Sequence, residues 1–175
     1  MRFRAGRVSA IGAGGYEPGA GVVIGGGPPV RWRAMEVPAE MRRAMVAHAL
    51  FCYPEEACGL LAADDRGRLR MAYCLTNADH SARTYTLEPE EHFRALRHAE
   101  ARGWHLAGVF HSHTHTPAYP SPTDVARALE PGWLYVLVSL QDRAAPAVRG
   151  FWIREGEIEE EPLAVRPGET VEVPQ

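Results

Sequence analysis

The sequence predicts a mixed α/β domain in which helices and strands form packed layers. Two observations support this fold class. Segments with apolar residues at helical spacing alternate loosely with short runs rich in valine, leucine and aromatic residues, all within residues 30–165. The chain has 175 residues, of which 46% are hydrophobic and 23% charged, and this is the size and composition of one ordinary globular domain.

The first half of this unit is predicted to contain two helices and four strands. The strands are expected at residues 30–37, 57–63, 69–75 and 84–87. Pro38 suits the first turn of a helix, and Pro54 ends that helix. The inner face of this helix is predicted to carry Met41, Ala44, Met45, His48 and Phe51. A second helix opens at Pro89 and closes at Gly103. Its inner stripe is predicted to carry Phe93, Leu96, and Ala99 or Glu100.

The second half is predicted to place one short helix among four further strands. An apolar strand runs directly into His111. Ser121 and Pro122 start the third helix, which stops before Pro131. The strands are expected at residues 104–110, 133–140, 151–154 and 158–165, the last two forming a hairpin.

Both ends of the chain differ from the patterned unit. Residues 1–29 hold nine of the seventeen glycines, without the strand, helix and glycine spacing of a dinucleotide-binding fingerprint. Such a segment loses much chain entropy on ordering and buries little, so we expect a flexible extension. Residues 166–175 are expected to form a similar short tail. The domain is therefore predicted to span residues 30–165.

Charge and composition exclude several classes of partner. The net charge of -3 offers neither a basic surface for nucleic acid nor a polybasic membrane patch. No apolar run reaches the ~20 residues of a membrane-spanning helix, so a cytoplasmic protein is expected. The three cysteines are too few, and odd in number, for a disulfide framework. We therefore expect reduced, buried thiols.

One stretch carries a pattern typical of metal chemistry. His111 and His113 lie two residues apart at the end of a predicted strand, so their imidazoles face the same side. A loop of ten residues then returns the chain to Asp124. Two imidazoles and one carboxylate form a donor set that suits zinc. Three protein ligands leave a fourth position for water, as in catalytic zinc sites.

Each of these residues also has an ordinary structural explanation. Alternating histidines can be polar residues on a solvated strand face. Ser121 at an N-cap with Asp124 at the third helical position forms a capping box, so Asp124 could act only as a capping acid. His115 is a further candidate ligand, although its position in the loop favours substrate contact or plain exposure.

The spacing of these residues resembles a known family motif. The string His-x-His-x(7)-Ser-x(2)-Asp, formed here by His111, His113, Ser121 and Asp124, matches the JAMM (MPN-plus) metallopeptidases without a gap. The resemblance implies that His111, His113 and Asp124 hold a catalytic Zn²⁺. It also implies that the Ser121 hydroxyl donates to the oxyanion formed from the scissile carbonyl, a role that competes with helix capping.

The same family places a glutamate upstream, where a helix gives way to a strand. Residues Glu56-Ala57-Cys58-Gly59 match that Glu-x-Cys-Gly segment. Glu55 is adjacent and chemically equal, and only the family spacing selects Glu56. The implied role of Glu56 is to accept the proton of the attacking water and deliver it to the leaving amine.

Further matches to the family lie at residues 118–121, 123–124, 130–132 and 135–139 and in the expected hairpin at 151–161. In these strings the chain most resembles the bacterial sulfur-carrier (CysO)-cysteine peptidase (Mec) group. The similarity runs from about residue 30 to residue 165 and is densest over residues 53–63 and 108–141. It implies a cytidine-deaminase-like α/β/α sandwich with a mixed central sheet. The implied partner is a ubiquitin-like sulfur carrier ending in Gly-Gly. The expected reaction is hydrolysis of the amide after Gly-Gly, which releases cysteine or a short C-terminal extension.

Three rival functions use the same fold. A deubiquitinase-like isopeptidase would use long insertions, whereas here the next predicted strand begins within ten residues of Asp124. A non-catalytic MPN scaffold would not be expected to keep all four metal-site and acid–base residues. The branch associated with DNA repair typically carries a helix-hairpin-helix region, and this sequence has neither that motif nor a basic face.

Overall fold

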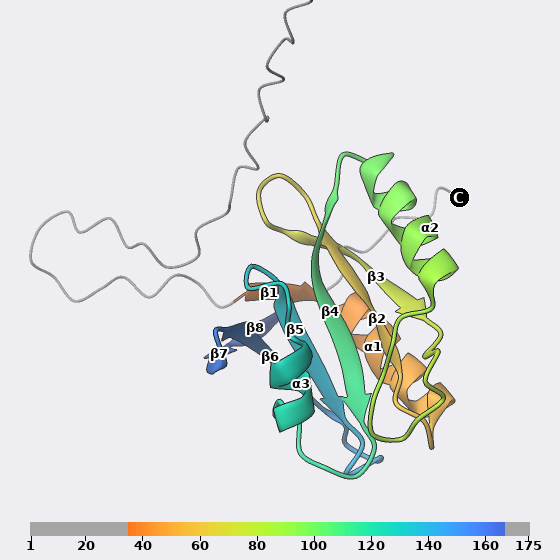
Figure 1. Cartoon of the computed structure of the whole chain (residues 1–175). Helices are drawn as coiled ribbons and strands as arrows, with labels where there is room; N and C mark the ends of the chain where they lie inside the picture. The colour runs from red at the N-terminus through yellow and green to blue at the C-terminus, as the bar shows by residue number, and fades with distance from the viewer. Residues whose placement is uncertain (1–34, 167–175) are drawn as a thin grey trace, which may run out of the picture. The chain divides into compact units, whose positions relative to one another are not determined.

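A six-stranded mixed sheet forms the centre of the domain that the structure describes (Figure 1). The computed structural model describes residues 35–166, so the predicted extension over residues 1–29 and the tail beyond residue 166 lie outside the described residues. The strands are β2 (Cys58–Ala63), β3 (Leu69–Leu75), β4 (His105–His113), β5 (Leu134–Ser139), β6 (Ala147–Arg154) and β7 (Glu157–Glu161). Their order is β3-β2-β4-β5-β6-β7, and within this sheet only the β4–β5 pair is parallel.

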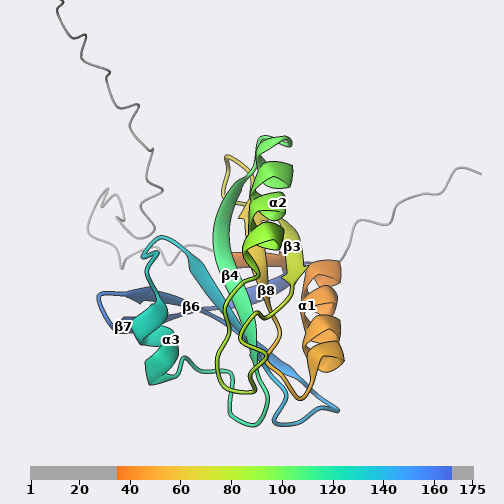
Figure 2. The ribbon, with the colours of Figure 1, turned by 45° about the vertical axis from the view of Figure 1, so that its right-hand side comes forward.

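Helices cover both faces of this sheet. Helix α1 (Ala39–Cys52) packs on one face, and α2 (Pro89–Glu100) and α3 (Pro122–Arg127) lie over the other (Figures 1 and 2). Successive residues of β2 point to opposite faces, so Leu61 joins the core cluster that contains Met45 of α1, whereas Leu60 joins the cluster that contains Ala95 of α2. The predicted α/β/α sandwich with a mixed central sheet is confirmed.

The closing hairpin differs from the prediction. Strand β7 ends at Glu161, and the chain after Pro162 forms a separate strand, β8 (Leu163–Arg166). Strand β8 pairs in parallel with β1 (Met35–Pro38) to form a small second sheet. Proline has no amide hydrogen to donate to a strand ladder, which explains why pairing with β6 stops there. The expectation of one strand over residues 158–165 was therefore wrong.

The buried faces of the two longer helices are also shifted from the predicted ones. Helix α1 buries Met41, Met45 and Ala49, whereas Phe51 is 87% exposed. Helix α2 buries Ala95 and Ala99, whereas Phe93 is 62% exposed. Each phenylalanine lies two residues from a buried alanine, which is about 200° around a helix. Of the predicted inner residues, Met41, Met45 and Ala99 are buried as expected.

Two further sequence expectations can be compared with the structure. The cysteines form no disulfide within the described residues, but only Cys58 is buried, and Cys74 is exposed. The expectation that all three thiols are buried was therefore wrong. Among the helices of residues 35–166, none has the length and apolar character needed to cross a membrane.

The glycine of the Glu-x-Cys-Gly segment allows β2 and β4 to pack as they do. Gly59 pairs with Phe110, and a methyl group on Gly59 would overlap the Phe110 ring and the Tyr73 carbonyl. The absence of a side chain lets the Phe110 ring lie across β2 in the core beside α1. Because Phe110 occupies that face, strand alternation directs His111 to the opposite face.

Candidate metal centre

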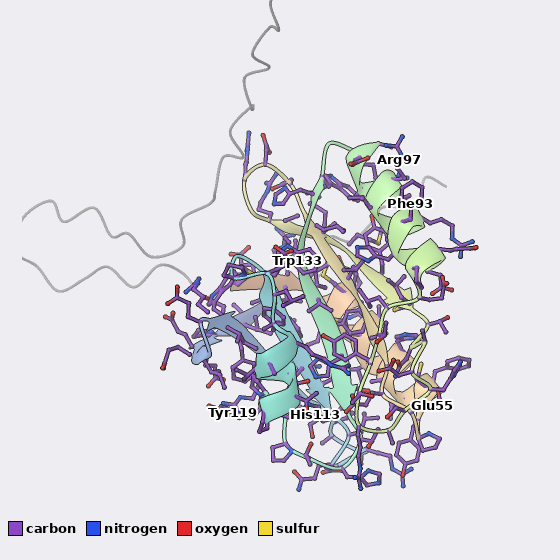
Figure 3. All side chains as sticks on the ribbon, in the orientation of Figure 1. Glu55, Phe93, Arg97, His113, Tyr119 and Trp133 are labelled. Carbon is purple, nitrogen blue, oxygen red and sulfur yellow. The ribbon has the colours of Figure 1, made fainter. Side chains whose placement is uncertain are left out.

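Strand β4 ends with the two predicted histidines, both of which are buried. Figure 3 labels His113 at the end of this strand, near α3. Ser112 lies between them and is bonded to the neighbouring segment: its Oγ accepts a hydrogen bond from the Ala57 amide at 2.8 Å, and its amide donates to the Ala57 carbonyl at 2.9 Å. These bonds hold the end of β4 against the residue that follows Glu56.

Helix α3 places Asp124 against both histidines. Ser121 caps the helix: its Oγ accepts from the Asp124 amide at 3.2 Å, and the Asp124 carboxylate accepts from the Ser121 amide at 2.6 Å. The same carboxylate has Oδ1 at 3.2 Å from His111 Nε2 and Oδ2 at 3.2 Å from His113 Nε2. The capping role predicted for Asp124 and its position beside the histidines are therefore compatible, because the cap orients the carboxylate.

The donor atoms have the spacing of ligands around one metal ion. His111 Nε2 lies 3.2 Å from His113 Nε2, and the two nitrogens contact different oxygens of the Asp124 carboxylate at 3.2 Å. One donor atom from each residue lies within 4.8 Å of the others, so the three residues outline a triangle. Ligands about 2.0 Å from a tetrahedral metal lie about 3.3 Å from one another. His113 Nδ1 donates to the Pro117 carbonyl at 2.9 Å, which leaves the Nε2 lone pair directed at the triangle. The group His111, His113 and Asp124 could thus hold a metal ion.

The surroundings favour the metal-binding protonation states of His111 and Asp124 but not that of His113. Burial lowers the pKa of His111, so its imidazole tends to be neutral and able to donate a lone pair. Burial raises the pKa of Asp124, but hydrogen bonds from His111 and His113 outweigh it and hold this pKa below its usual range. Burial also acts to lower the pKa of His113, but its hydrogen bonds to Asp124 and Pro117 outweigh burial, and this pKa is raised overall. A cation would have to displace that proton from His113.

The structure distinguishes the two adjacent glutamates. Glu56 is only 5% exposed, and its amide donates to the Ser81 carbonyl at 2.8 Å. Burial, opposed by His113 and reinforced by Asp124, raises the pKa of Glu56 from 4.5 to about 7. Glu55, labelled in Figure 3, instead forms an exposed ion pair of 3.2 Å with His80. Glu56 is therefore the carboxylate beside the donor group, as the family spacing implied.

Glu56→Gln is expected to stabilise the metal-free protein at neutral and alkaline pH. The raised pKa means that folded protein keeps a proton on Glu56 where unfolded protein has released it. The free energy of unfolding of the wild type should therefore fall as the pH rises from 4.5 to about 7. Glutamine cannot ionise, so the variant does not lose stability in this way. The free energy of unfolding of the variant relative to wild type should therefore increase between pH 4.5 and about 7 and stay constant at higher pH.

The difference in the free energy of unfolding can be measured by urea unfolding of both proteins in the presence of a chelator. The pH should be varied from about 5 to about 8, which covers the range in which the raised pKa acts. Comparing the two proteins at each pH cancels the titration of most other groups. A difference that does not change with pH would show that Glu56 ionises as easily in the folded state as in the unfolded chain.

Three further residues lie near the donor group. His115, the further candidate ligand, is exposed, is not part of the donor group, and bonds instead to Thr114 Oγ1 at 2.8 Å. Tyr85 stacks on His111, with ring centroids 4.6 Å apart. Asn77 is buried and donates to the Glu56 carbonyl at 3.0 Å. Sequence reasoning missed Tyr85 and Asn77, because neither lies in a spacing pattern with the motif residues.

Comparison with known proteins gives relatives over most of the chain. The CysO-cysteine peptidase of Mycobacterium tuberculosis is 41% identical over 128 residues, which cover 73% of this chain and 88% of that protein. A probable TtuB-protein conjugate cleaving protease of Thermus thermophilus is 32% identical over 122 residues, covering 69% of this chain and 77% of that protein. The solution structure of a protein from Desulfitobacterium hafniense has a TM-score of 0.71 and 31% identity, and covers 78% of this chain and 96% of that one.

Residues 38–154 match the family described as prokaryotic homologues of the JAB domain. This range includes the two histidines, Asp124, Ser121 and Glu56. Together with the 41% identity, the match confirms the resemblance to JAMM metallopeptidases drawn from the motif. The chain belongs to the family of prokaryotic JAB-domain homologues.

Proposed function

We propose that this protein is a zinc-dependent peptidase that hydrolyses the amide bond after the C-terminal Gly-Gly of a ubiquitin-like sulfur-carrier protein. The product would be the free carrier together with cysteine or a short C-terminal extension. One observation carries the proposal: a buried glutamate lies beside a three-donor group, close enough for His113 and Asp124 to shift its pKa. The 41% identity to a CysO-cysteine peptidase supports the choice of substrate.

The residues fit zinc in number, chemistry and spacing. Two imidazoles, which bind a metal in their neutral form, and one carboxylate form a typical donor set for a catalytic zinc site. Bound at His111, His113 and Asp124, the ion would supply a Lewis acid that polarises the scissile carbonyl and lowers the pKa of water to ~7. Because the protein would supply only three donors, one further coordination position would remain for water or substrate.

Glu56 is proposed to move the proton in this reaction. Its pKa of about 7 lies near neutral pH, where a carboxylate can both accept and return a proton. It would take a proton from the attacking water and then deliver it to the amine that leaves. Burial of this side chain limits competing exchange with solvent.

Ser121 is proposed to stabilise the oxyanion while it caps α3. Helix capping uses its oxygen as an acceptor for the Asp124 amide. A serine hydroxyl also has one hydrogen to donate, which the cap itself does not use. This hydrogen helps to hold the pKa of Asp124 low, so it would turn from Asp124 to the oxyanion during the reaction. The two roles that seemed to compete in the sequence therefore use different parts of one hydroxyl group.

The proposal is tested with the full chain loaded with zinc and three forms of one carrier. The first ends in Gly-Gly-Cys, the second carries a longer extension after Gly-Gly, and the third is joined through Gly-Gly to a lysine side chain. Mass spectrometry should find release of cysteine as the fastest reaction. A chelator should stop it, and added zinc should restore it. No cleavage of any form would overturn the proposal.

One alternative has a specific observation in its favour. The Thermus thermophilus relative is named for cleavage of TtuB-protein conjugates, which points to a deubiquitinase-like isopeptidase acting on carrier–protein conjugates. Preferential cleavage of the lysine-linked form would support this alternative. A non-catalytic scaffold is disfavoured by the assembled donor group and the buried Glu56. We place the reaction in the cytoplasm, in line with the free cysteines of the described residues.

A further inference from the structure

The loop between β3 and α2, residues 76–88, lies beside the metal centre and is organised by one side chain. This loop was expected to contain a strand over residues 84–87, but only a single bridge forms, between Asn77 and Leu87. Asn77 is 5% exposed, although it belongs to a loop. Figures 1 and 2 show the loop running alongside the end of β4.

Asn77 uses both ends of its amide. Nδ2 donates to the Glu56 carbonyl and to the Thr84 carbonyl, each at 3.0 Å, and lies 3.4 Å from the Ser81 carbonyl. Oδ1 accepts from the amides of Asp79 at 3.0 Å and Thr86 at 3.2 Å. Carbonyls at one end and amides at the other define the orientation of the side chain. A buried group with every hydrogen bond satisfied is rigid.

These bonds connect the two sides of the metal centre. One bond holds the backbone of Glu56, the proposed proton acceptor. Two others hold the residues on either side of Tyr85, namely Thr84 and Thr86. The Tyr85 ring stacks on His111 at 4.6 Å with an interplanar angle of 25°. The side-chain amide of Asn77 therefore connects the backbone of Glu56 to the segment that carries Tyr85.

We propose that Asn77 is a positioning residue, which aligns Glu56 with the donor group and holds Tyr85 over His111. Its side-chain hydrogen bonds go to Glu56 and to residues of its own loop rather than to the donor group, so it acts through the residues that it holds. This inference rests on the proposed function, because it takes Glu56 as the group that moves the proton. Misplacement of a catalytic group by about 1 Å can cost about 10²-fold in rate.

The test uses Asn77→Asp and Asn77→Ala in the full chain. Aspartate keeps the acceptor end and removes the donor to Glu56 and Thr84, whereas alanine removes both ends. Both variants are expected to bind zinc stoichiometrically and to keep KM for the carrier–cysteine adduct within about threefold. We expect kcat to fall by about 10- to 100-fold. The carboxyl introduced by Asn77→Asp can donate one hydrogen bond when it is protonated, so the kcat of this variant relative to wild type should recover as the pH falls.

Asp64→Asn is the matched control. Asp64 is a buried polar residue at the opposite end of β2, where it accepts from the Arg66 and Arg68 amides at 3.0 Å and pairs with the Arg68 guanidinium. Its loss should lower thermal stability as a damaged turn does, without changing kcat. If the Asn77 variants lose stability but keep the wild-type kcat, Asn77 only supports the fold and the proposal is wrong.

A measurement on the wild type keeps the test decisive if either variant fails to fold. The side-chain amide protons of Asn77 should exchange slowly with solvent, because both are bonded inside the protein. Exchange as fast as that of an exposed asparagine would contradict the proposal. Failure of the proposed function looks different: the wild type itself would not cleave the adduct, or Glu56→Gln would remain active.

Discussion

Glu56→Gln is expected to lower kcat for hydrolysis of a carrier–cysteine adduct by about 10²- to 10⁴-fold, the usual contribution of general acid–base catalysis. Glutamine has nearly the shape of glutamate, and it keeps the backbone bonds of Glu56 to Ser81 and Asn77. It cannot accept the proton of the attacking water. Zinc content, measured by elemental analysis, should stay at the wild-type value, because the donor group does not include Glu56.

Glu55→Gln is the matched control for this result. The two glutamates are adjacent and chemically equal, but Glu55 is bound to His80 in an exposed ion pair. Its replacement should leave kcat within about twofold, in line with the small contribution of exposed ion pairs. If Glu56→Gln kept its activity, or if Glu55→Gln lost it instead, the assignment of Glu56 as the proton acceptor would be wrong.

His113→Ala is expected to release the metal. The variant removes one of three donors and leaves His111 and Asp124, which cannot enclose an ion alone. Loss of an outer-shell partner typically costs 10- to 100-fold in affinity, so loss of a ligand should cost more than about 10²-fold. Zinc titration monitored by calorimetry or with a competing chelator would measure this change. Hydrolysis should fall with the metal content.

His115→Ala separates loss of a ligand from loss of any nearby histidine. His115 lies two residues further along the chain, but it is exposed and bonds to Thr114 rather than to the donor group. Its replacement should keep the wild-type zinc affinity. Wild-type zinc binding by His113→Ala would contradict the proposed site, and loss of zinc from His115→Ala would identify a ligand outside the triangle.

The accuracy of the sequence predictions depends on how local each feature is. The alternation that places His111 and His113 on one face of β4 involves neighbouring residues, and the structure has both side chains there. Helix faces were less accurate: Phe51 and Phe93 were predicted to be inside and are exposed. Hydrophobicity alone favoured the large aromatic residues, but the buried stripe of each helix instead includes an alanine two residues away, about 200° around the helix.

The sequence by itself indicated which residues could form the donor group, because strand alternation places His111 and His113 on one face and a capping box links Ser121 to Asp124. It also indicated the family, through the motif that these residues form. Only the tertiary structure brings Asp124, 11 residues from His113, against both histidines. The family spacing selected Glu56, but only the tertiary structure shows that Glu56 is buried while Glu55 lies in an exposed ion pair. The tertiary structure alone also brings Asn77 against Glu56 and Tyr85 against His111. Burial and hydrogen bonds between distant segments decide such matters, as between Asn77 and Glu56, which are 21 residues apart. No pattern of neighbouring residues encodes contacts of that kind.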